Sequence, residues 1–309
     1  MNKRKKILVP LDGSDRAMNT VKYITKIEPF LNGHIVLFHV FSSVPESFWD
    51  METDPRSSAT VKQVRAWEVQ HRRTMQEYME SARQVLLKAG VSAPAVEVKI
   101  QNRKTGFARD IIREAQKGYY AVVTRRRGMT GLRGLVLGSV ATKLVERLSF
   151  LPLILAGRKP AGNRILLTVD GSEGSWRAVD FVGNTLGGFE FEVRVIHVIR
   201  GKENSRPEMP RLYSPAKHTE FTRKQMAAEL ASVEKKLVDM GFKKHQISTA
   251  LVSGVISRAA AIAAEAEQQN CGTIVMGRRG HSRVRDFFIG RVTNKVIHLA
   301  RERTVWVVR

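Results

Sequence analysis

The sequence predicts an α/β protein made of two tandem, open, parallel five-stranded sheets flanked by helices, and two observations lead to this prediction. The first is an internal repeat: KILVPLDGSDRAMNTVKYI, which starts at Lys6, is matched by RILLTVDGSEGSWRAVDFV, which starts at Arg164. The second is the alternation, within each copy, of short apolar runs with longer amphipathic segments, which is typical of βαβ units. The length of 309 residues is sufficient for two domains with separate cores.

The repeat extends over most of the chain. GHIVLFHV, which ends at Val40, matches FEVRVIHV, which ends at Val198, and YYAVVTRRRG matches CGTIVMGRRG further along. Between the copies lies GRKPAGN, residues 157–163, whose glycine and proline content suits a linker. We therefore predict a first domain at residues 1–157, a linker at 158–163 and a second domain at 164–309.

Each element of the first copy is assigned from its apolar pattern. Five short apolar runs, KILVPLD, HIVLFHVF, AVEVKIQ, YAVVT and PLILA, are expected to be strands. These strands lie near residues 6–12, 34–41, 95–101, 120–124 and 152–156. The longer segments between them are expected to be helices near residues 14–29, 59–89, 106–117 and 139–148. SSVPESFWDMETDPRSS, after the second strand, is expected to be a loop.

The second copy repeats the same order of elements. Its strands are expected near residues 164–170, 191–199, 246–252, 273–277 and 304–308, and its helices near 174–187, 217–240, 255–269 and 291–301. A second loop of the same type, RGKENSRPEMPRLYSP, again follows the second strand. Both loops follow a strand end from which a lid could reach a ligand, although a passive surface loop is the commoner case.

Composition excludes several classes of protein. One cysteine, Cys271, excludes an internal disulfide and a cysteine-rich metal site, and the eight histidines form no HExxH pattern. The most apolar long segment, residues 132–156, is interrupted by charges, so no transmembrane segment is predicted. The basic N-terminus has too short an apolar run for a signal peptide, so we expect a cytoplasmic protein.

The net charge of +23 is shared by both halves. Residues 1–157 hold 26 basic and 14 acidic side chains, and residues 160–309 hold 24 and 15. Such a surface favours polyanions, that is, nucleic acid, anionic lipid or phosphorylated small molecules. The alternative is a solvated basic surface without a specific partner.

Glycine-rich loops follow the fourth predicted strand of each copy and are the candidate ligand sites. RRRGMTGLRGLVLGS starts at Arg125 and GRRGHSRVRDFFIGR starts at Gly277. In an open parallel sheet, ligands bind beyond the carboxyl ends of the strands, where the strand order reverses. Glycines allow the backbone to approach a phosphate closely, and the following helix N-terminus directs free N–H groups at the anion.

Both copies resemble universal stress protein domains. The resemblance rests on the strand ends LDGS and VDGS, the strands LFHV and VIHV, and the family's nucleotide loop, G-x₂-G-x₉-G followed by Ser or Thr. It implies a Rossmann-like sheet with strand order 3-2-1-4-5 in each copy. It also implies binding of ATP or AMP, with Mg²⁺ as a candidate companion of the phosphates, in a regulatory stress-response module.

Neither loop matches the family pattern completely. The first copy has Gly128, Gly138 and Ser139 but carries Arg125 at the first glycine position, whereas the second has Gly277, Gly280 and Gly290 but carries Arg291 in place of Ser or Thr. An arginine at the strand end obstructs close approach of a ribose, whereas Arg291 leaves the helix amides in place and adds a cation. The second copy is therefore the predicted binder.

By position, the resemblance also implicates residues at the ends of the first and second strands in adenine and ribose contacts. These are Pro10, Asp12 and Val40 in the first copy and Asp170 and Val198 in the second. Thr168 stands where the first copy has Pro10. The alternative for each aspartate is local: its carboxylate accepts hydrogen bonds from the following turn or helix.

Efficient catalysis is not predicted. The chain has no Walker loop and no kinase catalytic set, and His39 and His197 lie in apolar strands as expected of core histidines. The first hypothesis is a nucleotide-responsive module that meets an unidentified protein partner. The second is a basic surface that binds RNA, DNA or anionic membrane non-specifically, with arginines 125–127, 278, 279, 283 and 285 as its motivation. A third, weaker hypothesis is a slow ATPase or phosphotransferase.

The assembly is also predicted from the resemblance. In this family the fifth strands commonly pair across a two-fold axis, and the copies of one chain could satisfy that pairing as an internal pseudo-dimer, with a homodimer of chains as a further possibility. Trp306 would then lie at or near the interface.

Overall fold

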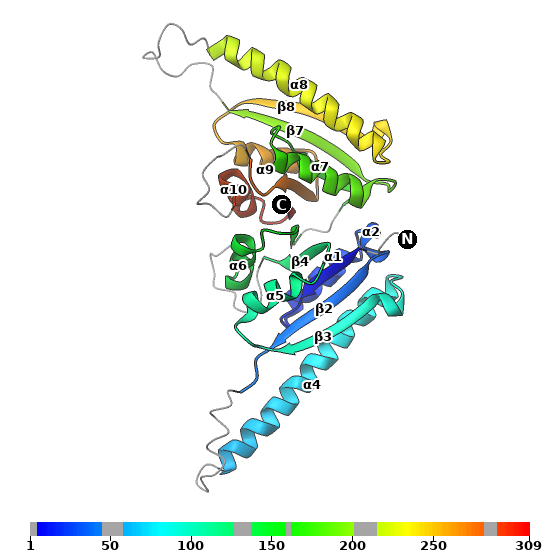
Figure 1. The fold of residues 1–309 in the computed structure, drawn as a ribbon, viewed down its shortest axis with the longest axis vertical. Coiled ribbons are helices and arrows are strands. Elements are labelled where there is room, and N and C mark those ends of the chain that lie inside the picture. The colour runs from blue at the N-terminus through cyan, green and yellow to red at the C-terminus, as the bar shows by residue number, and fades with distance from the viewer. Residues whose placement is uncertain (1–4, 45–57, 127–136, 159–161, 201–214, 281–288) are drawn as a thin grey trace, which may run out of the picture. The chain divides into compact units, whose positions relative to one another are not determined.

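The computed structural model describes residues 5–44, 58–126, 137–158, 162–200, 215–280 and 289–309. The two predicted loops after the second strands, the interior of each glycine loop including Gly128, and the middle of the predicted linker lie outside the described residues. By spatial contact the chain divides into two units (Figure 1). The first comprises Met1–Thr25 and Phe30–Leu144, and the second comprises Lys26–Pro29 and Val145–Arg309. The predicted domain boundaries stay a prediction.

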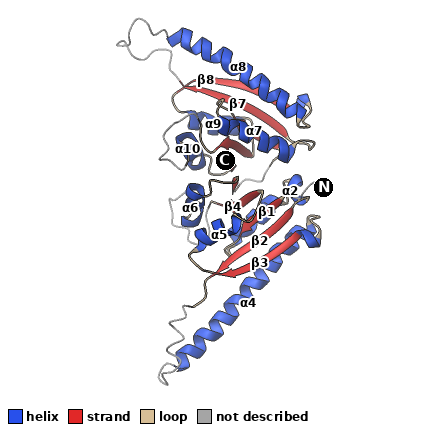
Figure 2. Cartoon of the chain, in the orientation of Figure 1, coloured by secondary structure: helices blue, strands red, loops and turns tan. Residues whose placement is uncertain are grey.

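The first unit is a parallel sheet with its strands in the order β3-β2-β1-β4. Its elements are β1 (Lys6–Pro10), α1 (Asp15–Ile24), β2 (His34–Phe41), α4 (Ser58–Lys88), the 3₁₀ turn η3 (Ala93–Ala95), β3 (Val96–Asn102), α5 (Phe107–Ala115) and β4 (Ala121–Arg125). Helices flank these strands, and α4 runs beside β3 (Figure 2). Two helices, α2 (Glu28–Leu31) and α6 (Ser139–Arg147), contain residues of both units.

Apolar runs make the central strands of this sheet. Ile7, Leu8 and Val9 of β1 have no exposed surface, because β1 lies between β2 and β4 and helices cover the sheet. A strand buried on both faces has an unbroken apolar sequence, as the sequence predicted for this one. The predicted helix at 14–29 is wrong in one respect: α1 ends at Ile24 and the short α2 follows.

The second unit repeats this arrangement and adds two strands, β10 and β5. Its elements are β5 (Leu153–Ala156), β6 (Arg164–Thr168), α7 (Glu173–Leu186), β7 (Glu192–Arg200), α8 (Pro215–Asp239), the 3₁₀ turn η4 (Lys244–Gln246), β8 (Ile247–Val255), α9 (Arg258–Gln268), β9 (Thr273–Gly277), α10 (Arg291–Leu299) and β10 (Thr304–Val308). Its strand order is β8-β7-β6-β9-β10, followed by β5. The order 3-2-1-4-5 expected of each copy is therefore confirmed.

The fifth strands of the two copies pair with each other. β5 is antiparallel to β10, with Ile154 opposite Trp306 and Leu153 opposite Val307. Trp306 is completely buried, and its ring makes an edge contact with Phe181, with centroids 5.5 Å apart. The pairing of fifth strands within one chain is thus confirmed, and Trp306 lies on it as expected.

In the part of the chain that the structure describes, no helix is both long and apolar enough to cross a membrane.

Candidate functional site

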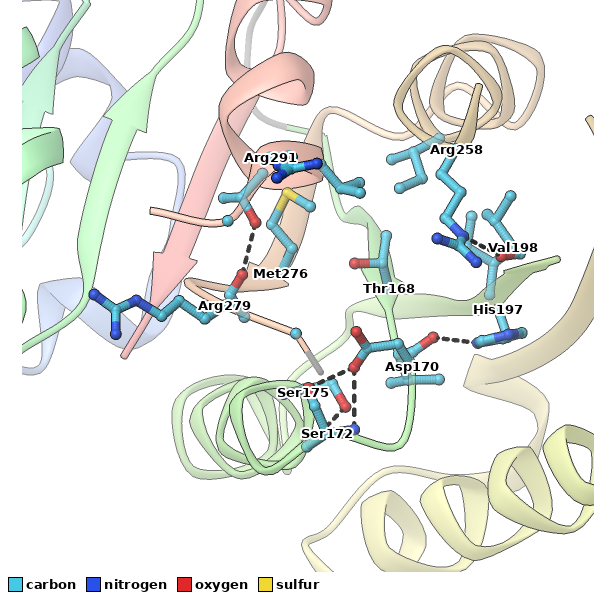
Figure 3. A pocket seen from close by; sticks show the side chains of 18 residues that line it. Thr168, Asp170, Ser172, Ser175, His197, Val198, Arg258, Met276, Arg279 and Arg291 are labelled. Carbon is cyan, nitrogen blue, oxygen red and sulfur yellow. Dashed lines mark hydrogen bonds between the residues drawn. The ribbon is translucent and has the colours of Figure 1, made fainter. Parts of the chain in front are cut away.

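A pocket of about 430 Å³ lies at the carboxyl ends of β6, β7 and β9 in the second unit (Figure 3). The sheet order places β6 between β7 and β9, so the chain leaves β6 in one direction and returns on its other side. This is the position at which open parallel sheets bind ligands. Its volume falls within the range of small-molecule pockets, about 300–1,000 Å³.

The predicted residues of the second copy gather around this pocket. Asp170 follows β6, Val198 lies in β7, Gly277 ends β9, and Gly280, Gly290 and Arg291 complete the lining from the glycine loop and the start of α10. Residues more than a hundred positions apart are thus brought to one cavity by the strand order.

Asp170 has a local role as well as a place in the pocket. Its Oδ1 accepts hydrogen bonds from the backbone N of Ser172 at 3.1 Å and from the Ser172 hydroxyl at 2.5 Å. The same hydroxyl accepts from the Ser175 N at 3.2 Å, which makes Ser172 the N-cap of α7. Oδ1 of Asp170 therefore has the local role that was the alternative to ligand binding, since it accepts hydrogen bonds from the turn that precedes α7.

Gly280 lies against the other oxygen of that carboxylate. A Cβ added at Gly280 would stand 2.2 Å from Asp170 Oδ2, a separation that real side chains do not tolerate. Only glycine allows this loop to run so close to Asp170. Any side chain at position 280 would therefore displace the acidic wall of the pocket.

Gly277 serves packing between a strand and a helix. A Cβ there would lie 2.6 Å from the carbonyl carbon of Gly174, in the first turn of α7, and a Cβ at Gly174 would lie 2.3 Å from the Arg279 carbonyl oxygen. The two glycines permit the end of β9 to contact the start of α7 through backbone alone. Sequence reasoning assigned Gly277 to ligand approach and missed Gly174.

The start of α10 forms another wall. Gly290 is its N-cap, has an extended backbone and supplies no side-chain cap. The Thr293 hydroxyl donates to the Gly277 carbonyl at 2.9 Å, which ties this helix to β9. The first N–H groups of a helix have no acceptor within the helix and, with the helix dipole, favour an anion.

In the described part of the chain, three arginines line the pocket: Arg258, Arg279 and Arg291. Arg258, the first residue of α9, donates from Nε to the Val198 carbonyl at 3.2 Å, which holds its guanidinium beside β7. In Figure 3 the Arg279 side chain extends away from Asp170 and Thr168. Sequence reasoning missed Arg258, whose only signal is a basic residue directly after the helix-capping Ser257.

His39 and His197 differ in exposure, but each makes the same kind of hydrogen bond in its own copy. His39 Nδ1 lies 2.8 Å from the Leu11 carbonyl, and His197 Nδ1 lies 2.8 Å from the Val169 carbonyl, so Nδ1 is the donor in both rings. Burial lowers the pKa of His39, against the raising effects of that backbone hydrogen bond and of Asp12. His39 is buried as expected of a core histidine, whereas His197 lines the pocket.

Arg278 is not a surface cation, contrary to its place in the basic-surface hypothesis. It is only 5% exposed and donates to the carbonyls of Val145, Glu146 and Leu148 at the end of α6, at 2.5, 2.9 and 3.1 Å. Burial, and then the charge of Arg279, lower its pKa to about 10. Arg126, at the same position of the first copy, is equally buried, so these two arginines belong to the interior.

The first copy places its predicted residues in matching positions. Pro10 ends β1, Val40 lies near the end of β2, and Gly138 and Ser139 open α6, with the Gly138 N donating to the Arg126 carbonyl at 2.7 Å. Asp12 Oδ1 accepts from the Ser14 N and hydroxyl, at 3.1 and 2.6 Å, as Asp170 does from Ser172. Gly128 lies outside the described residues.

Arginines replace the packing glycines of the second copy here. Arg16 stands at the position of Gly174 and Arg125 at that of Gly277. The first copy therefore cannot form the same backbone-to-backbone contact between its fourth strand and first helix.

Comparison with known proteins agrees with this architecture. The sequence profile of the Universal stress protein family matches residues 3–152 and again residues 162–309. Universal stress protein Slr1230 of Synechocystis sp. (strain ATCC 27184 / PCC 6803 / Kazusa) is 22% identical over 317 residues, which cover 95% of this chain and 96% of that protein.

Two solved structures have the same fold over almost the whole chain. A universal stress protein from Archaeoglobus fulgidus DSM 4304 matches with a TM-score of 0.60 and 19% identity, covering 99% of this chain and 96% of that one. A protein of unknown function from Pseudomonas aeruginosa PAO1 matches with a TM-score of 0.58 and 16% identity, covering 99% and 92%.

Proposed function

The chain belongs to the universal stress protein family, and we propose that its second unit binds an adenine nucleotide, ATP or AMP, as a regulatory module without efficient catalysis. The observation that carries this proposal is that six residues line one and the same pocket: Asp170, Val198, Gly277, Gly280, Gly290 and Arg291. The nucleotide loop and the strand ends in the sequence predict all six as ligand-binding residues.

The chemistry of the lining suits a nucleotide. The lining includes the apolar side chains of Val198 and Ile262 as well as the positive charge of Arg291 at the start of α10. Phosphates bind at helix N-termini and beside arginines, and a base prefers apolar walls with a few polar groups. In this arrangement the glycine loop and Arg291 hold the phosphates, and Asp170 accepts hydrogen bonds from the ligand's hydroxyl groups.

The donor set favours binding over turnover. Among the described residues that line the pocket, Asp170 is the only carboxylate, and one of its oxygens already accepts two hydrogen bonds from Ser172. Phosphoryl transfer requires a positioned nucleophile and metal-binding groups in addition to cations. Mg²⁺ would accompany ATP through the phosphates, and Asp170 is the carboxylate of the described lining that could contact it. A slow ATPase is the alternative.

A regulatory role would come from an effect of the nucleotide on the glycine loop. The phosphates of a bound nucleotide would hold this loop in one conformation, and the protein would then present a different surface to an unidentified protein partner. The cytoplasmic location and an additional homodimer of chains stay predictions.

Calorimetric titration of ATP with Mg²⁺, and then of AMP, tests the proposal with Gly280→Ala as the decisive variant. The added methyl group would collide with Asp170 Oδ2, so we expect at least a ten-fold loss of affinity, about 1.4 kcal/mol or more. Gly162→Ala is the matched control, because its Cβ would lie 4.0 Å from the nearest atom, the Arg164 backbone N. The proposal fails if the wild-type protein, freed of co-purified nucleotide, binds neither ligand at millimolar concentration.

Arg291→Ser separates the phosphate contact from the rest of the pocket. The substitution restores the family's hydroxyl and removes a cation, so ATP affinity should fall more than AMP affinity. Equal losses for both nucleotides would place Arg291 away from the terminal phosphates.

A further inference from the structure

A continuous set of aromatic rings and arginines lies on the first unit, outside the pocket described above. We call it the aromatic platform and define it as Phe41, Trp67, His71, Arg72, Arg103 and Phe107. We propose that the aromatic platform binds single-stranded nucleic acid without sequence specificity, by stacking bases on its exposed rings, Trp67 and Phe107, and pairing phosphates with its arginines.

Stacked rings form the centre of the platform. Trp67 and His71, one turn apart on α4, stack with centroids 5.1 Å apart and an interplanar angle of 12°. His71 in turn contacts Phe41, the last residue of β2, at 5.3 Å. A row of rings thus runs from an exposed tryptophan to a buried phenylalanine at a strand end.

Arginines lie over the rings. The Arg72 guanidinium is 4.3 Å from the Phe41 centroid, and its Nη2 donates to the Asn102 side-chain carbonyl at 2.9 Å. The Arg103 guanidinium is 5.6 Å from the Phe107 centroid, and the Arg103 N donates to the Phe41 carbonyl at 2.7 Å. These contacts connect α4, the ends of β2 and β3, and the start of α5.

The exposed rings of the platform, Trp67 and Phe107, are not needed to fill the core. The second half of α4 anchors the helix through Met75, Met79 and Leu86, all buried, whereas Trp67 is 55% exposed. Among the described residues, the large aromatic side chains classed as exposed are Trp67 and Phe107, and both belong to the platform. Exposed rings beside cations are the combination that single-strand-binding surfaces use.

The charge around the platform matches a polyanion. The helix segment at residues 58–73 carries four basic side chains and one acidic side chain, Glu68, and Lys104 follows Arg103 directly. Single-strand-binding surfaces combine aromatic stacking of successive bases with cations along the backbone. A lipid surface would use the charge but has no use for parallel stacked rings, so nucleic acid is the better match.

The second unit lacks the tryptophan and phenylalanine rings, with His218 at the position of Trp67, and therefore provides an internal control. Ile199 stands at the position of Phe41, Thr222 at that of His71, and Arg258 at that of Phe107. It keeps the arginine: Arg223 donates to the Ser253 hydroxyl at 3.0 Å, as Arg72 donates to Asn102.

Fluorescence anisotropy with labelled oligo-dT tests the proposal on the full chain. We expect wild-type binding that weakens with salt, about a ten-fold loss of affinity for Trp67→Ala, and a larger loss for Trp67→Ala combined with Phe107→Ala. Arg72→Ala should weaken binding several-fold, whereas its counterpart Arg223→Ala should leave it within about two-fold. Circular dichroism checks that each variant is folded.

Three outcomes would overturn the proposal. They are no oligo-dT binding at low salt, unchanged binding by the tryptophan variants, or equal losses for Arg72→Ala and Arg223→Ala, which would mean that charge alone is involved. Vesicles of phosphatidylserine and phosphatidylcholine form the competing arm: if Trp67→Ala abolished vesicle binding and left oligo-dT binding intact, the platform would be a membrane surface.

Two further measurements separate the platform from the nucleotide pocket. Millimolar ATP should not displace oligo-dT, and Gly280→Ala should bind it as wild type does, since that glycine lies in the second unit. Displacement by ATP together with loss in Gly280→Ala would assign the oligonucleotide to the pocket and overturn the proposal.

Discussion

The two copies of one fold have different residues at equivalent positions, and the differences that bear on binding include several at the carboxyl ends of the strands or at the start of the helices that follow them. In the second copy, Gly174 and Gly277 allow backbone contact beside a pocket, where the first copy has Arg16 and Arg125. In the first copy, Phe41 and Phe107 contribute rings where the second has Ile199 and Arg258. In both proposals the duplicated sheet is the common scaffold, and the residues that would bind a ligand lie in or beside the loops that follow the strands, where sequence varies most freely.

The largest expected effect contrasts Gly174→Ala with Arg16→Ala. Alanine normally favours a helix over glycine, yet at position 174 its Cβ would lie 2.3 Å from the Arg279 carbonyl oxygen. We expect a loss of about 2–3 kcal/mol in unfolding free energy for Gly174→Ala, and a change within about 0.5 kcal/mol for the exposed Arg16→Ala. Guanidinium denaturation measures both, and a neutral Gly174→Ala would show that the close contact is dispensable.

Acid should weaken the first unit through Glu114. This carboxylate is 3% exposed and accepts hydrogen bonds from Lys99, Lys117 and Tyr119. Burial alone would raise its pKa, but those hydrogen bonds outweigh burial and lower it to about 2 from the usual 4.5. Because the folded pKa is depressed, the stabilisation is complete above about pH 4.5 and is lost as pH falls towards 2.

Glu114→Gln measures this contribution. We expect a loss of about 1–2 kcal/mol at neutral pH, allowing for solvent screening, and a gap to wild type that closes as pH falls towards 2. The control in the second unit is Glu265→Gln, which removes a contact to one cation, Arg194, at 3.1 Å, and should cost less. A pH-independent gap for Glu114→Gln would refute the assignment.

Substitution of the two capping serines by alanine should reduce stability equally but should affect ATP binding unequally. Ser14 and Ser172 each cap a helix and donate to an aspartate, so Ser14→Ala and Ser172→Ala should each cost about 1 kcal/mol in thermal or chemical unfolding. Only Ser172→Ala releases Asp170 in the pocket, and we expect it to weaken ATP binding roughly three- to ten-fold. Weaker ATP binding by Ser14→Ala would place a working site in the first copy as well.

The smallest expected effect is on the stability of Trp67→Ala. Because this side chain is 55% exposed and stacks on one neighbour, we expect unfolding free energy to change by no more than about 0.5 kcal/mol. A loss of several kcal/mol in chemical denaturation would mean that the tryptophan supports the fold, contrary to its assignment to a binding surface.

Much of the architecture could be predicted from local patterns. The repeat and the apolar runs led to the duplication and to the alternation of strands and helices, whereas the strand order in both copies and the pairing of β5 with β10 followed from the family resemblance. The predicted 14–29 helix failed because α1 ends at Ile24, before Thr25 and the turn that follows, and apolar spacing alone does not detect such an end. Six residues assigned to the second site from motif position do line one pocket, but their role there stays a proposal.

The sequence by itself determined the duplication, the parallel α/β fold and the edge of the sheet at which a ligand would sit, because apolar periodicity and glycine spacing are local properties of the chain. Only the tertiary structure decided three other matters: that Gly277 meets Gly174, that Arg278 is buried against the end of α6, and that Trp67 and His71 join Phe41. The reason is physical: each depends on the approach of segments distant in sequence, and packing fixes that approach once the sheet has formed.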